Sequence, residues 1–190
     1  MSAPRRDKAR ETNISWIFAL LKQGKTGSAQ YLGRMEDFQL PTSDQPLPDK
    51  LQSASDQMLD EVLLTLKLER ALTFAKIDGA WRVGSSHEVP TDDFWNMAPI
   101  SLGILESAVN TKEVVLLMDA GSSDEFGARA SVVLTGIRSV ACAPYVGESG
   151  EVLALLYADN RIQTGAFSKD DGETLMELAA ELGRRLTSVG

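Results

Sequence analysis

The chain has 190 residues, of which 43% are hydrophobic and 24% are charged, and its formal net charge is −8. These values are ordinary for a water-soluble globule, and the length accommodates one domain with an appendage. The acidic balance excludes binding that depends on Lys and Arg neutralising phosphates, so we expect neither nucleic acid nor an anionic membrane as a partner.

The chain has one cysteine, Cys142, so an intramolecular disulfide is excluded. The longest apolar run near the start, residues 14–21, is too short to span a bilayer, and we find no export signal. We therefore expect a cytoplasmic protein. Cys142 lies inside an apolar run, where a cysteine usually serves as a small buried hydrophobe instead of a reactive thiol.

The first 47 residues are predicted to form a helical extension and a linker. Ile14, Ile17, Phe18 and Leu21 recur at helical spacing, which predicts an amphipathic helix that must dock on another surface. Residues 40–48 contain three prolines and no periodic pattern, as linkers do. We place a boundary here and expect an N-terminal extension over residues 1–47 and one domain over residues 48–190.

After the linker, the pattern predicts a helix and then a β-hairpin. Apolar residues recur every three or four positions over residues 48–66, which is typical of one helix face. Residues 69–77 alternate as a strand does. The pair Asp78-Gly79 favours a type I′ turn, which joins this strand to a second one beginning near Trp81. Residues 85–98 are interpreted as a loop.

The middle of the chain predicts a helix over residues 101–110, a short strand over residues 113–118 and one or two helical turns over residues 128–134. Two apolar runs follow, at residues 137–145 and 152–158, and a polar turn separates them. Runs of this length that are apolar on both faces are typical of strands buried on both sides. We expect them to form a hairpin at the centre of an antiparallel sheet, and we expect Pro144 to end the first strand.

The last helix begins at Ser168, which forms a capping box with Asp171 in place of the usual Glu. Leu175, Leu178, Leu182 and Leu186 follow at helical spacing. Strands and helices therefore interleave along the chain. Because the hairpins require antiparallel pairing, the fold class is α+β and not a doubly wound parallel sheet.

Three segments resemble the GAF domain, a small-ligand and signalling relative of the PAS fold. They are residues 136–144 (GIRSVACAP), 150–161 (GEVLALLYADNR) and 165–171 (GAFSKDD). The resemblance extends from about Leu51 to Leu186 and leaves residues 1–47 without a counterpart. It implies a central antiparallel sheet of five to six strands with helices on both sides, to which this chain adds an N-terminal helical extension.

The resemblance also implies a non-catalytic sensory or regulatory domain without a cofactor. The family's methionine sulfoxide reductases need several cysteines, and its phytochromes attach a bilin at a motif that is missing around Cys142. The single histidine, His87, lies in polar loop sequence, and no phosphate-binding glycine motif occurs. The cyclic-nucleotide branch is matched only in part, because Gly172 stands where that motif has Glu.

GAF domains bind small ligands between the sheet and the segments before the central hairpin, which correspond here to residues 92–104 and 118–129. These segments supply aromatic walls and a few charges, as ligand sites prefer. The expected ligand-binding residues are Phe94, Trp95, Met97, Asp119, Phe126 and Arg129. The alternative is that the same side chains only cover an apolar sheet face.

GAF domains often pair through their first and last helices, so we expect a homodimer. The expected interface residues are Trp16, Ile17, Leu20, Leu182 and Leu186. The leading interpretation is a domain that binds a small molecule or a partner and signals through its terminal helices to a fused or associated output protein. The alternative is a ligand-free module for structural dimerisation or protein interaction.

Overall fold

A computed structural model describes residues 39–66, 68–97, 99–121 and 135–189. The expected N-terminal helix with Trp16, Ile17 and Leu20 lies outside these residues. The same holds for Phe126 and Arg129 of the expected ligand site, and for the helical turns expected over residues 128–134.

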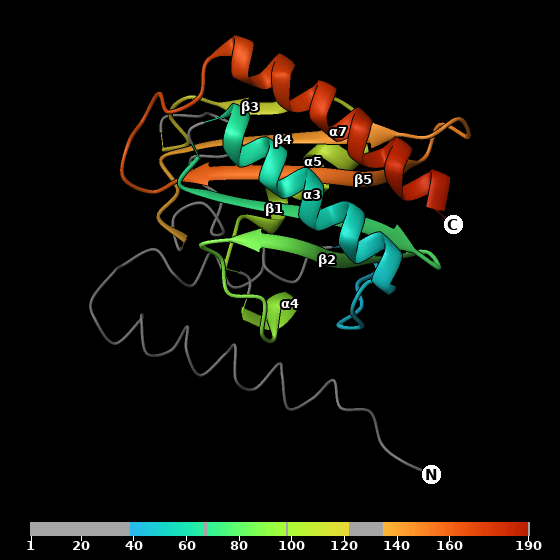
Figure 1. Ribbon diagram of the computed structural model, residues 1–190. Helices are drawn as coiled ribbons and strands as arrows, with labels where there is room; N and C mark the ends of the chain where they lie inside the picture. The colour runs from blue at the N-terminus through green and yellow to red at the C-terminus, as the bar shows by residue number, and fades with distance from the viewer. Residues whose placement is uncertain (1–38, 67, 98, 122–134, 190) are drawn as a thin grey trace.

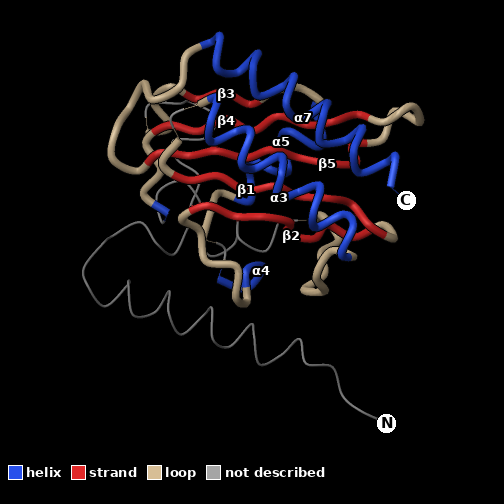
Figure 2. The backbone as a smooth tube through the Cα atoms, in the orientation of Figure 1, coloured by secondary structure: helices blue, strands red, loops and turns tan. Residues whose placement is uncertain are grey.

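A five-stranded antiparallel sheet forms the centre of the domain, as the sequence predicts (Figure 2). The strands are β1 (Arg70–Ile77), β2 (Ala80–His87), β3 (Val115–Leu117), β4 (Ser139–Val146) and β5 (Val152–Asn160). They lie in the order β2-β1-β5-β4-β3. Strand β5 is therefore the middle strand, and β4 pairs with it over its whole length. The apolar hairpin predicted for the centre is confirmed.

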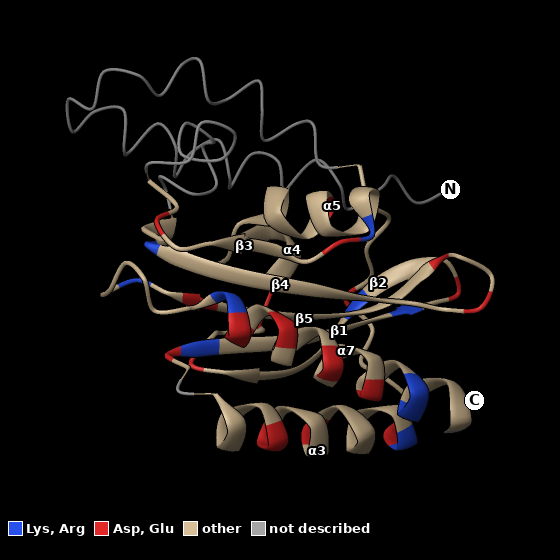
Figure 3. Ribbon diagram, turned by 90° about the horizontal axis from the view of Figure 1, so that it is seen from above, with Lys and Arg blue, Asp and Glu red and all other residues tan. Residues whose placement is uncertain are grey.

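Helices cover both faces of the sheet (Figures 1 and 3). Helices α3 (Asp49–Thr65) and α7 (Lys169–Val189) lie on one face, and α4 (Phe94–Met97) and α5 (Leu102–Thr111) lie on the other. Each face has its own core: Leu156 and Ala158 of β5 pack toward α3 and α7, whereas Leu155 and Tyr157 pack toward α5. This alternation follows from the period of two along a strand.

Two local expectations are confirmed in detail. Asp78 and Gly79 have φ angles of 51° and 77°, as the type I′ turn between β1 and β2 requires. At the start of α7, the Ser168 N–H donates to Asp171 Oδ2 (2.7 Å) and the Asp171 N–H donates to Ser168 Oγ (3.2 Å). The shorter Asp side chain therefore closes a capping box as Glu does.

Two local expectations are wrong. Within residues 85–98, which were expected to form a loop, residues 85–87 belong to β2 because their backbone continues the pairing with β1, and residues 94–97 form α4. Pro144 does not end β4, which continues to Val146. Strand β3 pairs only with residues 140–142 of β4, so β4 is an edge at Pro144. No strand pairs with β4 on the β3 side of Pro144, so the N–H that proline lacks costs no hydrogen bond of the sheet.

The proline-rich linker packs on the domain that follows it. The Trp81 N–H donates to the Pro41 carbonyl (2.8 Å), and the Ser43 N–H donates to the Trp81 carbonyl (2.9 Å). Thr42 therefore forms a single parallel bridge with Trp81 at the outer edge of β2. Leu47 is 5% exposed and packs with Leu51 and Ala75. The boundary after residue 47 stays a prediction.

Candidate functional site

Phe94 and Trp95 of α4 lie together against the sheet. Their ring centroids are 5.0 Å apart in an edge-to-face arrangement, and both rings contact Phe74 of β1 at 5.7 and 5.8 Å. Such aromatic pairs contribute beyond their buried area. Phe94 is 2% exposed, so it belongs to the core, whereas Trp95 is only partly buried. Trp95 is thus the member of the pair that an occupant of this region can reach.

A cleft of about 330 Å³ opens beside Trp95 at the edge of the sheet. Residues 43–46 of the linker, Gln52 of α3, residues 83–84 of β2 and residues 91–95 line it. The Trp95 indole N–H donates to the Ser43 carbonyl (3.1 Å) and so ties α4 to the linker. The volume is at the small end of the range for ligand sites.

Met97 and Asp119, the two other expected ligand-binding residues that the structure describes, do not join this cluster. Met97 is 65% exposed and does not line the cleft beside Trp95. Asp119 follows β3, which is the edge strand opposite to β2, and its carboxylate accepts the N–H of Gly121 (3.1 Å). The structure therefore brings Phe94 and Trp95 together and places Asp119 at the far edge of the sheet.

A buried ion pair lies at the junction between α4 and α5, and sequence analysis did not identify it. Arg70 of β1 donates from Nη1 to both carboxylate oxygens of Asp159 on β5 (3.0 and 3.2 Å). The Tyr157 hydroxyl donates to Asp159 Oδ2 (2.9 Å). Arg70 is 4% exposed and Asp159 is 0% exposed. The sequence holds one hint of this pair, because Arg70 and Asp159 are charged residues in otherwise apolar strands and a buried charge requires a partner.

Burial shapes the titration of this cluster. Burial raises the pKa of Asp159 to about 6, although the Arg70 guanidinium and the Tyr157 hydroxyl act in the opposite direction. Burial, with the Asp159 charge next, raises the pKa of Tyr157 well above its usual value. Because the folded-state pKa of Asp159 is raised, this group stabilises the fold most at low pH, and the contribution is lost as the pH rises through about 6.

Two arginines converge on one backbone carbonyl next to this ion pair. The Pro99 carbonyl accepts Nη2 of Arg70 (2.8 Å) and Nη2 of Arg161 (2.7 Å). Partial burial and the nearby Arg70 charge lower the pKa of Arg161. Pro99 lies between α4 and α5, and Arg161 begins the segment that leads from β5 to α7. Hydrogen bonds thus join the α4–α5 junction to the segment that leads from β5 into α7.

The single cysteine and the single histidine lie on different strands, with β1 and β5 between them. Cys142 is 0% exposed on β4, and burial raises its pKa far above the usual value, so the expectation of a buried structural cysteine is confirmed. His87 ends β2 at the sheet edge. Within the described residues, no cluster of three His, Cys, Asp or Glu side chains is arranged to hold a metal ion. None of the described helices is both long and apolar enough to cross a membrane.

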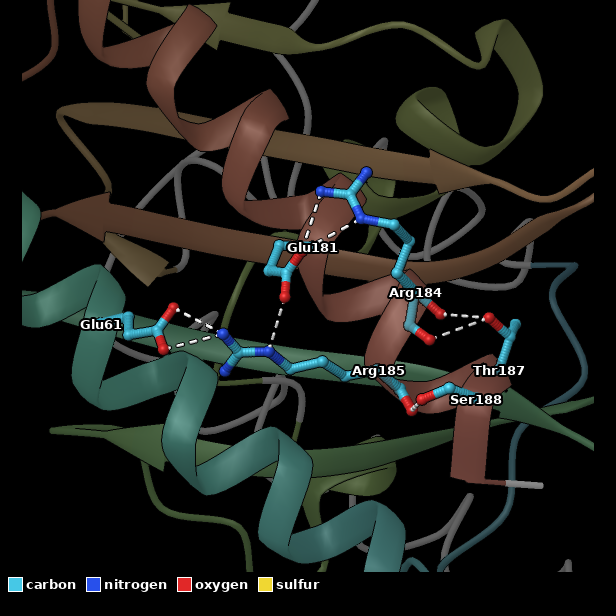
Figure 4. A network of polar contacts seen from close by, with 7 residues as sticks. Glu61, Glu181, Arg184, Arg185, Thr187 and Ser188 are labelled. Atoms are coloured by element: carbon cyan, nitrogen blue, oxygen red, sulfur yellow. Dashed lines mark hydrogen bonds and ion pairs between the residues drawn. The ribbon is translucent and has the colours of Figure 1, made fainter.

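The terminal helices α3 and α7 are joined by a polar network (Figure 4). Arg185 of α7 donates from Nη2 to both carboxylate oxygens of Glu61 on α3 (2.9 and 3.1 Å), and from Nε to Glu181 (2.9 Å). Leu182, which was expected at a dimer interface, is 0% exposed because it packs in the core beneath these helices. Its side chain offers no surface to a partner, and Leu186 is partly buried against the same core.

Replacing Trp95 with Phe should release the linker from α4. The phenyl ring retains the contacts with Phe74 and Phe94, but it has no donor for the Ser43 carbonyl. We expect the free energy of unfolding to fall by about 1 kcal/mol, the usual net contribution of one hydrogen bond. Urea unfolding measures this loss. A loss above about 3 kcal/mol would contradict this expectation and show that Trp95 stabilises the fold mainly through the packing of its larger ring.

The family model described as GAF domain matches residues 50–186. A comparison with curated proteins gives no match. Among solved structures, a GAF domain/HD domain protein from Geobacter sulfurreducens is 14% identical with a TM-score of 0.56, over 73% of this chain and 92% of that one.

Two further solved structures are similar. A GAF domain of Synechocystis in its photoproduct state is 18% identical with a TM-score of 0.56, over 73% of this chain and 95% of that one. The GAF domain from an Acinetobacter phosphoenolpyruvate-protein phosphotransferase is 16% identical with a TM-score of 0.56, over 75% of this chain and 85% of that one. At these identities the likeness concerns the fold alone.

Proposed function

Because the chain belongs to the GAF domain family, we propose that it is a non-catalytic regulatory domain that binds a small molecule or a partner and signals through its terminal helices. GAF domains are commonly sensory or regulatory. The observation that supports the proposal best is the bonding of Pro99 to Arg70 and Arg161. It joins the segment that covers the expected ligand site to the segment that leads into α7.

The proposed signal begins at helices α4 and α5 and the junction between them, which we call the α4–α5 cover (residues 94–97 and 99–111). An occupant between this cover and the sheet displaces α4 or the α4–α5 junction. The displacement reaches the rest of the domain through Trp95 and Pro99, whose hydrogen bonds hold α4 to the linker and the junction to Arg70. Arg161 then transmits the displacement to residues 162–168 and α7. A ligand acts in this way only to the extent that it binds one arrangement more tightly than the other.

The output lies in the pair of helices α3 and α7. The Glu61–Arg185 ion pair sets their spacing on the surface of the domain. A fused or associated output protein senses a change in this pair, and the proposed homodimer involves the same helices together with residues 14–21. Leu64 of α3 is 88% exposed and Met176 of α7 is 45% exposed, so each helix presents an exposed apolar side chain.

The second candidate function is a ligand-free interaction module. The packing of Phe94 and Trp95 against Phe74 favours it, because these rings already fill the space beneath α4. The two functions differ in one respect that is open to measurement. A sensory domain responds to a small ligand at the α4–α5 cover, whereas an interaction module responds only to its protein partner.

A ligand screen separates these functions. Cyclic AMP, cyclic GMP and free amino acids are added to the full chain while tryptophan fluorescence and the melting temperature are recorded. A binding ligand raises the melting temperature by mass action and changes the emission of Trp95. The Trp95→Phe variant should lose the fluorescence response but still show the ligand-induced rise in melting temperature, measured from its own lower starting value. If no ligand alters either signal in the wild type, the interaction module becomes the better account.

Removing the bridge between the terminal helices should alter their motion more than their stability. Arg185→Met keeps the aliphatic stem but loses the bonds to Glu61 and Glu181. Partly exposed ion pairs contribute little, so the free energy of unfolding should fall by less than about 1 kcal/mol. Spin labels at positions 60 and 177 should report a broader distribution of α3–α7 distances. Arg184→Met, which loses only its bonds to Glu181, is the matched control.

A further inference from the structure

The outer edge of β2 is only partly covered by the linker. Alternate residues of an antiparallel strand direct their N–H and C=O groups away from the partner strand. Trp81 does so, since its N–H and carbonyl bind the linker. The register with β1 continues without a bulge from Trp81 to Val83, so the backbone of Val83 also faces the open edge.

Trp95 prevents the linker from covering Val83. In a continued parallel pairing, the Ser43 carbonyl would accept the Val83 N–H. It accepts the Trp95 indole N–H instead, and the linker leaves the strand at that point. Residues 44–46 and residues 83–84 then both line the cleft. The register turns the Val83 N–H and carbonyl away from β1, and among the described residues no backbone hydrogen bond from outside the sheet reaches them.

The strand beyond Val83 is held inward by a bulge. The Ser85 N–H donates to Thr73 Oγ1 (2.7 Å) and to Ser55 Oγ (3.0 Å), so it is unavailable at the edge. Gly84 permits this arrangement, because a Cβ there would collide with the Ser55 and Thr73 hydroxyls. The cleft is therefore a short, defined stretch of strand edge, and an extended chain is the chemical partner for its free N–H and carbonyl.

Charge determines which extended chain fits. Asp44 of the linker and Asp92 and Asp93, which directly precede α4, line the cleft, and all three are exposed. Asp93 is engaged with Asn96, but within the described part of the chain no hydrogen bond or ion pair occupies the carboxylates of Asp44 and Asp92. The Trp95 ring adds a surface on which an aliphatic stem or a cation can lie. Basic side chains next to a β-paired backbone match this lining.

We propose that the cleft beside β2 binds a short, extended, basic peptide, which adds to the sheet by pairing with Val83 and places Lys or Arg side chains against Asp44 and Asp92. The peptide continues the parallel pairing that the linker begins at Trp81. This surface lies at the outer edge of β2 and does not require a small ligand beneath the α4–α5 cover. The ligand screen therefore tests the proposed function, and a separate peptide-binding experiment tests this site.

The test uses the full chain and the peptide acetyl-Lys-Val-Arg-Val-Lys-amide. We expect saturable binding by calorimetry and at least tenfold slower hydrogen exchange of the Val83 amide in the bound state, because the amide gains a partner. The peptide acetyl-Glu-Val-Glu-Val-Glu-amide should not bind. The basic peptide methylated at its backbone nitrogens keeps its charges, but it has no donor for the Val83 carbonyl and its methyl groups clash with the strand edge, so it should neither pair with β2 nor protect Val83.

Matched variants separate the cleft from the general acidity of the chain. Asp44→Asn with Asp92→Asn should weaken binding roughly fivefold, as expected for two exposed charge pairs. Asp170→Asn with Glu173→Gln removes the same charge from α7 and should leave the affinity unchanged. Unchanged exchange at Val83 with saturating peptide, or equal weakening in both double variants, would overturn the proposal.

Discussion

Gly183→Ala should destabilise the domain by about 3 kcal/mol, although alanine ordinarily favours a helix over glycine by about 1 kcal/mol. Gly183 lies in α7 directly beneath the ring of Tyr145 on β4. A Cβ at this position would overlap Cγ, Cδ1 and Cε1 of that ring. The backbone of α7 and the ring are both held by the core, so neither yields easily. The melting temperature should fall by about 6–12 °C.

Two further variants isolate the steric cause. At Gly172, in the first turns of α7, a Cβ meets only the tip of Leu116 at 3.3 Å, so Gly172→Ala should be close to neutral or stabilising. Tyr145→Ala together with Gly183→Ala should be much less destabilised than the sum of the single variants, because the overlap is absent. An unchanged melting temperature for Gly183→Ala would show that α7 does not lie this close to β4.

Arg70→Leu should cost about 3–5 kcal/mol at pH 7, because it leaves the buried Asp159 carboxylate without a cation. The loss should be smaller at pH 5. Arg70 is the strongest influence that lowers the pKa of Asp159, so its removal raises that pKa further above 6 and the carboxyl is neutral at pH 5. A neutral carboxyl requires no ion partner. Urea unfolding at both pH values measures the difference.

The control is an arginine at the same end of the sheet. Arg138 immediately precedes β4 and its side chain is exposed, so Arg138→Leu should change the free energy of unfolding by no more than about 0.5 kcal/mol at either pH. Equal losses for Arg70→Leu at pH 5 and pH 7 would contradict the assignment of Asp159 as the group that titrates.

Sequence patterns were sufficient for the fold where local chemistry determines the backbone. The apolar runs of β4 and β5, the Asp78-Gly79 turn and the Ser168–Asp171 box each depend on neighbouring residues, and each is present. Pro144 was misjudged because its tolerance depends on β3 being short, which is a property of a distant strand. Residues 85–87 were misjudged for the same reason, because their place in the sheet depends on β1 and on the distant hydroxyl groups of Ser55 and Thr73.

The candidate site was predicted less completely. Phe94 and Trp95 share a four-residue helix, so their proximity follows from the sequence. Asp119 was grouped with them by resemblance, but the sheet order separates them. The Arg70–Asp159 pair joins residues 89 positions apart, and no periodic pattern identifies such a partner. The cleft beside Val83 depends on a hydrogen bond from Trp95 to the linker, which sequence analysis treated as a separate element.

Hydrogen exchange in the Arg161→Met variant tests most directly whether the α4–α5 cover and α7 are coupled. Arg161 is exposed, so its replacement removes one bond to Pro99 without opening the core. The account predicts faster amide exchange both at the start of α5 and in the first turns of α7, relative to the wild type. Faster exchange confined to the start of α5, with α7 unchanged, would contradict it.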